Sequence, residues 1–86
     1  MVNYNLVIPK STQKEIKQLQ VDAIKRILER LDKLCEDPYP VDCKKLKTDL
    51  GFRIRVGDYR VIYTVDKTNR IINIAKIGHR KEVYRK

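Results

Sequence analysis

The chain has 86 residues, 42% of them hydrophobic, and a net charge of +9. Because a chain of this length buries about 60–65% of its unfolded surface, it can form one compact core but not two. No apolar run approaches the roughly 18 residues of a membrane span, and the N-terminus lacks the basic start and apolar stretch of a signal peptide. The sequence therefore predicts one domain over residues 1–86, located in the cytoplasm and away from membranes.

The charge is confined to one half of the chain. Residues 1–43 contain seven Lys or Arg and seven Asp or Glu, whereas residues 44–86 contain thirteen and four. A basic field restricted to one part of a small domain is typical of a site that binds a polyanion. The alternative is a basic surface that only keeps the protein solvated.

The cysteine and histidine content argues against a metal or a disulfide framework. Cys35 and Cys43 are too few for such a framework, and His79 is the only histidine in a sequence without a CxxC pair. Zinc sites need more ligands than these. We also find no P-loop and no glycine-rich phosphate loop. We therefore expect the two cysteines to be free thiols, and we expect no metal and no cofactor.

The chain begins with a strand and a short helix. Residues 2–8 are β-rich and read as one strand, which Pro9 ends. In the segment 11–19, Thr12 and Glu15 have the spacing of a capping box. Together with the thin apolar edge of Ile16 and Leu19, this spacing predicts a short first helix in this segment.

A longer helix follows, with Asp22 as its expected N-cap. Its apolar residues recur with helical spacing, and charged residues fill the opposite face. The helix is expected to end before Pro38, because the residue preceding a proline avoids helical angles. The apolar stripe, interpreted as core packing, consists of Ile24, Ile27, Leu28, Leu31, Leu34 and Cys35.

The second half of the chain predicts strands. Residues 43–47 read as a short edge strand, and a two-residue Gly57–Asp58 turn joins two strands of a β-hairpin. Further along, Gly78 is expected to close the last strand and a basic tail to follow. The two predicted strands of the hairpin cover residues 52–56 and 59–65. A second turn is predicted at 66–69, and the last strand at 70–77. The fold class is α+β: an antiparallel, hairpin-connected sheet with both helices packed on one face.

The turn length predicts which residues share a face. A two-residue turn pairs Arg55 with Arg60, and directly opposed residues lie on the same side of a sheet. Arg53 is two positions from Arg55 and joins them, so the three arginines emerge opposite the apolar face. Like charges placed directly opposite destabilise a sheet, so this arrangement favours an anionic ligand. Guanidinium groups bind phosphate oxygens in a fork, which identifies phosphate as the candidate ligand.

The sequence resembles the RelE/ParE superfamily of bacterial and archaeal toxins, and its RelE branch in particular. The resemblance covers nearly the whole chain. It rests on the helical pair ending in EDP, on KKLK, on FRIRVGDYRVIY and on IGHRKEVYR. It implies a RelE-like fold and a toxin of a type II toxin–antitoxin system.

The resemblance also implies site residues. Motif matching places a catalytic set on Arg53, Arg55, Arg60, Arg80 and Tyr84. Neighbouring basic residues expected to bind RNA are Lys45, Lys47, His79 and Lys81. The best-understood members carry lysines at the first two catalytic positions. Because arginine stays protonated at any usual pH, the general base is left open between Tyr84, His79 and none.

The implied activity is a ribosome-dependent, metal-independent endoribonuclease that cleaves mRNA in the A site and inhibits translation. Its implied partners are mRNA, the small ribosomal subunit and an acidic, RelB-like antitoxin. No carboxylate cluster in the basic region could hold Mg²⁺ for a two-metal reaction. Two alternatives remain: a ParE-like toxin that binds DNA gyrase without cleaving, and a non-toxic basic module that binds nucleic acid.

Overall fold

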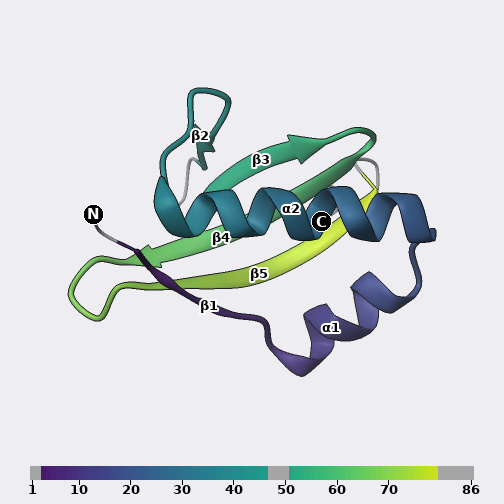
Figure 1. The fold of residues 1–86 in the computed structure, drawn as a ribbon, viewed down its shortest axis with the longest axis horizontal. Helices are drawn as coiled ribbons and strands as arrows, with labels where there is room; N and C mark the ends of the chain where they lie inside the picture. The colour runs from purple at the N-terminus through teal and green to yellow at the C-terminus, as the bar shows by residue number, and fades with distance from the viewer. Residues whose placement is uncertain (1–2, 47–50, 80–86) are drawn as a thin grey trace.

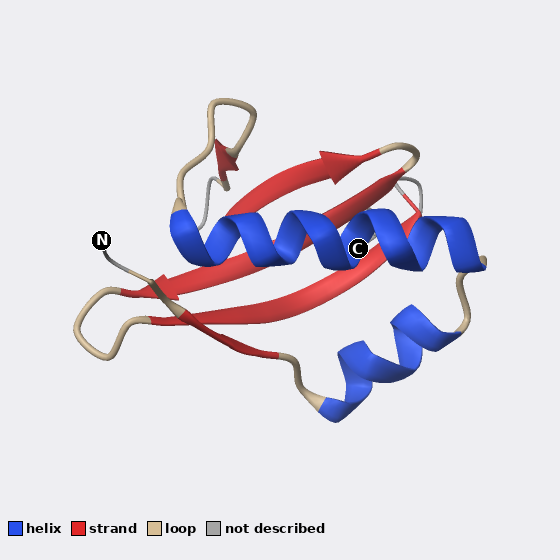
Figure 2. Ribbon diagram, viewed as in Figure 1, coloured by secondary structure: helices blue, strands red, loops and turns tan. Residues whose placement is uncertain are grey.

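The computed structural model describes residues 3–46 and 51–79, which form two helices and a five-stranded sheet (Figure 1). The elements in chain order are β1 Asn5–Val7, α1 Lys10–Lys17, α2 Val21–Glu36, β2 Lys44–Lys45, β3 Phe52–Val56, β4 Tyr59–Asp66 and β5 Ile71–His79. This order and the α+β class confirm the prediction. Figure 2 shows the helices and strands by colour.

The sheet is mixed rather than wholly antiparallel. Its strand order is β1-β5-β4-β3-β2. The pairs from β2 to β5 are antiparallel, as the hairpin pattern predicted, whereas β1 runs parallel to β5 with Asn5 opposite Ile71. The first strand is also shorter than predicted, since β1 covers only Asn5–Val7. The last strand continues through Gly78 to His79, so Gly78 does not close it.

Helix α2 lies across one face of the sheet (Figure 1) and supplies one side of the core. Its Ile27, Leu31 and Leu34 are buried, as the apolar spacing predicted, but Leu28 is 42% exposed and does not belong to the core. The helix starts two residues earlier than expected, with Gln20 as its N-cap, so Asp22 is not the cap. The carboxylate of Asp22 lies in the first turn, where it stabilises the positive end of the helix dipole. Neither described helix has the length and apolar content needed to cross a bilayer.

Tyr63 fastens the segment after α2 to the sheet. Its ring is fully buried and stacks on Phe52 at 5.8 Å, and its hydroxyl donates to the carbonyl oxygen of Pro38 at 2.7 Å. Burial raises the pKa of Tyr63 far above its ordinary value, so the hydroxyl stays neutral and keeps this bond. Cys35 and Cys43 flank the same segment and are free thiols.

Helix α1 closes the edge of β5 that β1 leaves open. The buried hydroxyl of Thr12 donates to the carbonyl oxygens of Ile74 and Ala75 at 3.1 and 3.3 Å. The carboxylate of Glu15 accepts from the backbone N–H of Ile77 at 3.0 Å and pairs with Lys76 at 3.0 Å. These side chains therefore replace the hydrogen bonds that another strand would make.

This role corrects two predictions. Thr12 and Glu15 do not form a capping box, because their polar atoms bond to β5, and Pro9 is the N-cap of α1 without a side-chain cap bond. The two helices do not lie side by side on one face either. While α2 covers the face, α1 lies along the β5 edge and contributes Ile16 to the core.

We expect Thr12→Val to lower the free energy of unfolding by about 1–3 kcal/mol, because it leaves buried carbonyls without their donor. Ser11→Ala is the matched control: Ser11 is the preceding residue, and its hydroxyl is exposed. Its effect is expected to stay within about 0.5 kcal/mol. Chemical denaturation of both variants measures the difference. Equal stabilities would show that the Thr12 hydroxyl does not hold the β5 edge.

Candidate functional site

The β3–β4 hairpin has the register that the turn length predicted. Val56 pairs with Tyr59, and Arg55 pairs with Arg60 across the two-residue turn. Gly57 adopts φ +61°, the left-handed conformation that such a turn requires at its first position. The register puts Ile54 and Val61, which is directly opposite it, on the side that α2 covers. The residues before and after them along each strand therefore point to the other side of the sheet.

We call this other side of β3 and β4 the arginine face, defined by Arg53, Arg55 and Arg60. Within the described ranges no helix covers it. Arg55 is exposed and Arg53 is half-buried, whereas Arg60 is only 7% exposed. The three arginines share the predicted side of the sheet, but Arg60 is buried there and not exposed. Its cross-strand neighbour on β5 is Gly78, which has no side chain to occupy the same space.

Strand β2 adds a cation that sequence reasoning missed. Lys44 pairs with Arg53, so it lies on the arginine face. A hollow of about 420 Å³ is lined by Lys44, Arg53, Arg55, Gly57 and Asp42. Lys45 pairs instead with Phe52, which places it on the opposite face, away from the arginines, and speaks against its predicted role in RNA binding. The sequence KK could not show which lysine faces which way, because the pairing of β2 with β3 was unknown.

His79 does not join the arginine face. It ends β5 and pairs with Tyr59, which belongs to the apolar face of β4. The two rings contact each other edge to face at 6.0 Å between centroids. His79 and Tyr59 line a separate cavity together with Glu15 of α1 and with Leu19, which follows that helix. The structure therefore separates the histidine from the three arginines.

Four predicted site residues lie outside the described residues: Lys47, Arg80, Lys81 and Tyr84. Their roles stay predictions from the resemblance. Among the residues that the structure does describe, no group of three or more His, Cys, Asp or Glu could hold a metal ion.

The chemistry open to this surface is that of fixed positive charge. Arginines remain protonated, so they can bind phosphate oxygens and stabilise additional negative charge on a reacting phosphate. A guanidinium as buried as that of Arg60 acts where the effective dielectric is lower, which strengthens its interaction with an anion. Arg53, Arg55 and Arg60 therefore place fixed positive charge on one face of β3 and β4, with Arg60 largely buried.

Comparison with known proteins identifies the family of this chain. Residues 6–84 match the family model of the ParE toxin of the type II toxin–antitoxin system parDE. A relative from Methanocaldococcus jannaschii, RelE1, provisionally named a toxin, is 35% identical over 88 residues and covers 98% of both chains.

Solved structures agree with the sequence match. The archaeal RelE–RelB complex from Pyrococcus horikoshii superposes with a TM-score of 0.81 at 35% identity, covering 93% of this chain and 97% of that one. The RelB–RelE antitoxin–toxin complex from Methanococcus jannaschii has a TM-score of 0.74 at 27% identity, covering 91% and 94%. The chain therefore belongs to the RelE/ParE family of toxins of type II toxin–antitoxin systems, as a RelE-like member.

Proposed function

We propose that this toxin is a ribosome-dependent endoribonuclease that cleaves mRNA in the A site and thereby inhibits translation. The observation that supports it is the arginine face, on which Arg53, Arg55 and Arg60 lie together on adjacent strands of one sheet. Such a face matches the needs of a reaction at an RNA phosphate. The relatives described as RelE toxins add support from the family.

The proposed reaction uses the RNA as its own nucleophile. The 2′-OH attacks the adjacent phosphorus, the bond to the 5′-oxygen breaks, and the products are a 2′,3′-cyclic phosphate and a 5′-OH. Arg60 and Arg80 stabilise the charge of the pentacoordinate phosphorane. Arg53 and Arg55 hold the backbone phosphates. Tyr84 stacks on a base or moves a proton, and no step needs a metal.

The structure bears on the choice of general base. Since Arg53 and Arg55 stay protonated, neither accepts the 2′-OH proton efficiently. His79 lies on the face opposite Arg60, against Tyr59, which disfavours it as the base at the same phosphate. We therefore assign proton transfer to Tyr84. The alternative is that no side chain transfers the proton, and that positioning and charge stabilisation alone drive slow cleavage of the RNA.

A gyrase-binding toxin without nuclease activity is the second candidate. It is favoured by the matching family model, which is that of the ParE toxin. Because both kinds of toxin share the fold, the strand arrangement alone does not separate them. The sequence positions of Arg80 and Tyr84 favour the nuclease, since ParE-like toxins typically lack the complete basic set with a C-terminal tyrosine.

The proposed partners are mRNA with the small ribosomal subunit, and an acidic, RelB-like antitoxin. The two solved complexes above contain RelE together with RelB. A toxin with a net charge of +9 is complementary to an acidic chain. We infer that the antitoxin covers the arginine face or displaces residues 79–85, because either would disable the same site.

Arg60→Gln tests the catalytic assignment, because it removes the charge and keeps a long side chain. We expect cleavage to fall about 10²–10³-fold, as for the loss of one donor to a reacting oxyanion. Since Arg60 is 7% exposed, its replacement also changes stability by more than the about 0.5 kcal/mol of a surface substitution. Denaturation must therefore confirm that the variant is folded.

The readout is growth after induction, with primer extension to map mRNA cuts. Lys10→Gln, which changes an exposed lysine at the start of α1, is the charge-matched control and is expected to act like wild type. A folded Arg60→Gln variant that still cuts would contradict the assignment. Growth arrest by the wild type with inhibited gyrase and intact mRNA would establish the ParE-like alternative.

Binding to mRNA-programmed ribosomes is expected to weaken steeply with salt. Neutralising about 6–10 phosphates releases counterions, so affinity falls by about 10³–10⁵ between about 50 and 200 mM salt. A cleavage-resistant mRNA with a 2′-O-methyl group at the A-site codon allows equilibrium titration. Affinity that does not change over this range would rule out the arginine face as the RNA site.

Co-expression with the neighbouring reading frame tests the antitoxin. We expect a short, net-negative chain, partly disordered when free, that folds on binding and restores growth. A tag on one chain should purify both, and the association rate should fall as salt rises. If the two chains do not co-purify and growth is not restored, the antitoxin assignment fails.

A further inference from the structure

Asp42 sits at the border of the basic hollow beside β2 and β3. It lines that hollow with Lys44, Arg53 and Arg55. Asp42 lies in the turn that precedes β2. A carboxylate at this position would compete with RNA phosphate for the neighbouring cations, so its orientation decides the charge of the hollow.

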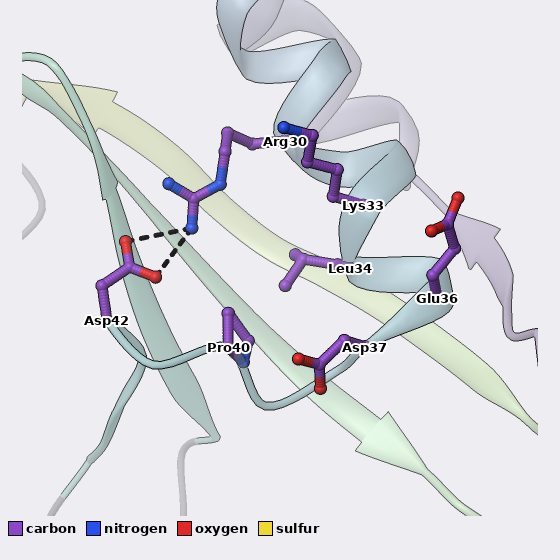
Figure 3. A pocket seen from close by; sticks show the side chains of 7 residues that line it. All are labelled: Arg30, Lys33, Leu34, Glu36, Asp37, Pro40 and Asp42. Carbon is purple, nitrogen blue, oxygen red and sulfur yellow. Dashed lines mark hydrogen bonds and ion pairs between the residues drawn. The ribbon is translucent and has the colours of Figure 1, made fainter.

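Arg30 of α2 holds this carboxylate. Its Nη2 donates to Oδ1 of Asp42 at 2.9 Å and to Oδ2 at 3.0 Å, as Figure 3 shows. The two side chains are 28% and 51% exposed. A pair this exposed contributes little to folding. Its clearest consequence is electrostatic: the acid at the border of the hollow is neutralised by a cation from the helix side of the sheet.

The remaining charges in the hollow are all positive. Lys44 is exposed and directly opposite Arg53, so their Cβ atoms lie about 4.5–5.5 Å apart. Arg55 follows Arg53 by two residues, about 7 Å along β3. An ammonium group is a compact point charge on a flexible stem. Lys44 and Arg53 can therefore reach one phosphate. The phosphate at Arg60 lies beside the Arg55–Arg60 pair, which is the next pair along β3 on the same face.

We propose that this hollow is a second RNA phosphate subsite, with Lys44 as a ligand, and that the Arg30–Asp42 pair keeps it cationic. This inference rests on the proposed function, because it assigns a further backbone phosphate to the same RNA. Lys44 binds the phosphate beside Arg53 and positions the strand without contacting the reacting phosphate. Arg30 acts through Asp42 and does not contact RNA.

Lys44→Ala and Lys45→Ala form a matched pair for the test. Both remove one positive charge from an exposed residue of the same two-residue strand, but only Lys44 is on the arginine face. Affinity for ribosomes programmed with the 2′-O-methyl mRNA is measured as a function of salt. We expect Lys44→Ala to weaken binding about threefold to tenfold and to lower the log–log salt slope by about 0.7, and Lys45→Ala to do neither.

The outcomes separate this subsite from the proposed function. If Arg55→Ala weakens binding but the two lysine variants behave alike, the subsite is overturned and the arginine face stands. If wild-type binding is independent of salt and Arg55→Ala is without effect, the arginine face fails as an RNA site and the subsite fails with it. A lower salt slope for Lys44→Ala alone supports the subsite.

Arg30→Gln tests the neutralised carboxylate. Freed from Arg30, Asp42 is expected to repel phosphate, so this variant should weaken RNA binding about threefold to tenfold. Adding Asp42→Asn should restore most of the affinity, and Asp42→Asn alone should bind at least as tightly as wild type. A double variant as weak as Arg30→Gln would overturn the role of the pair. Denaturation of all three variants controls for folding.

Discussion

The two-residue turn at Gly57 and Asp58 is the constraint on which the rest of the structure depends. A turn of this length permits one register between β3 and β4, and that register decides the face of every residue on both strands. With it, Ile54 and Val61 reach the core under α2. The same register sends Arg55 and Arg60 to the other side, which neither of the described helices covers. A slip of one residue would bury the arginines under the helix and expose the core.

Much of the fold could be predicted because the signals were local. The apolar spacing of α2, the proline that follows it and the hairpin turn each depend on a few neighbouring residues. The pairing of β1 with β5 could not be predicted, since it joins residues about 66 positions apart in sequence. Thr12 and Glu15 were misassigned for a similar reason: their spacing matches a local cap, but their partners are on β5.

The candidate site was predictable to the extent that it follows from the hairpin. The common face of Arg53, Arg55 and Arg60 came from turn length alone, whereas the burial of Arg60 depends on three-dimensional surroundings that no strand pattern gives. The same limit applies to Lys44 and Lys45, which only the β2 register tells apart. The position of His79 needed the length of β5, which runs beyond the glycine expected to end it.

The way α1 closes the β5 edge has a consequence for self-association. An unpaired strand edge is a template for strands from other molecules, and here Thr12 and Glu15 occupy the backbone groups of Ile74 to Ile77 that would pair. The opposite edge, β2, is two residues long and carries two lysines, which discourages sheet extension. Detachment of α1 would leave this part of the β5 edge unpaired. Heat-induced aggregation is therefore expected to begin from a partly opened molecule, before the sheet itself unfolds.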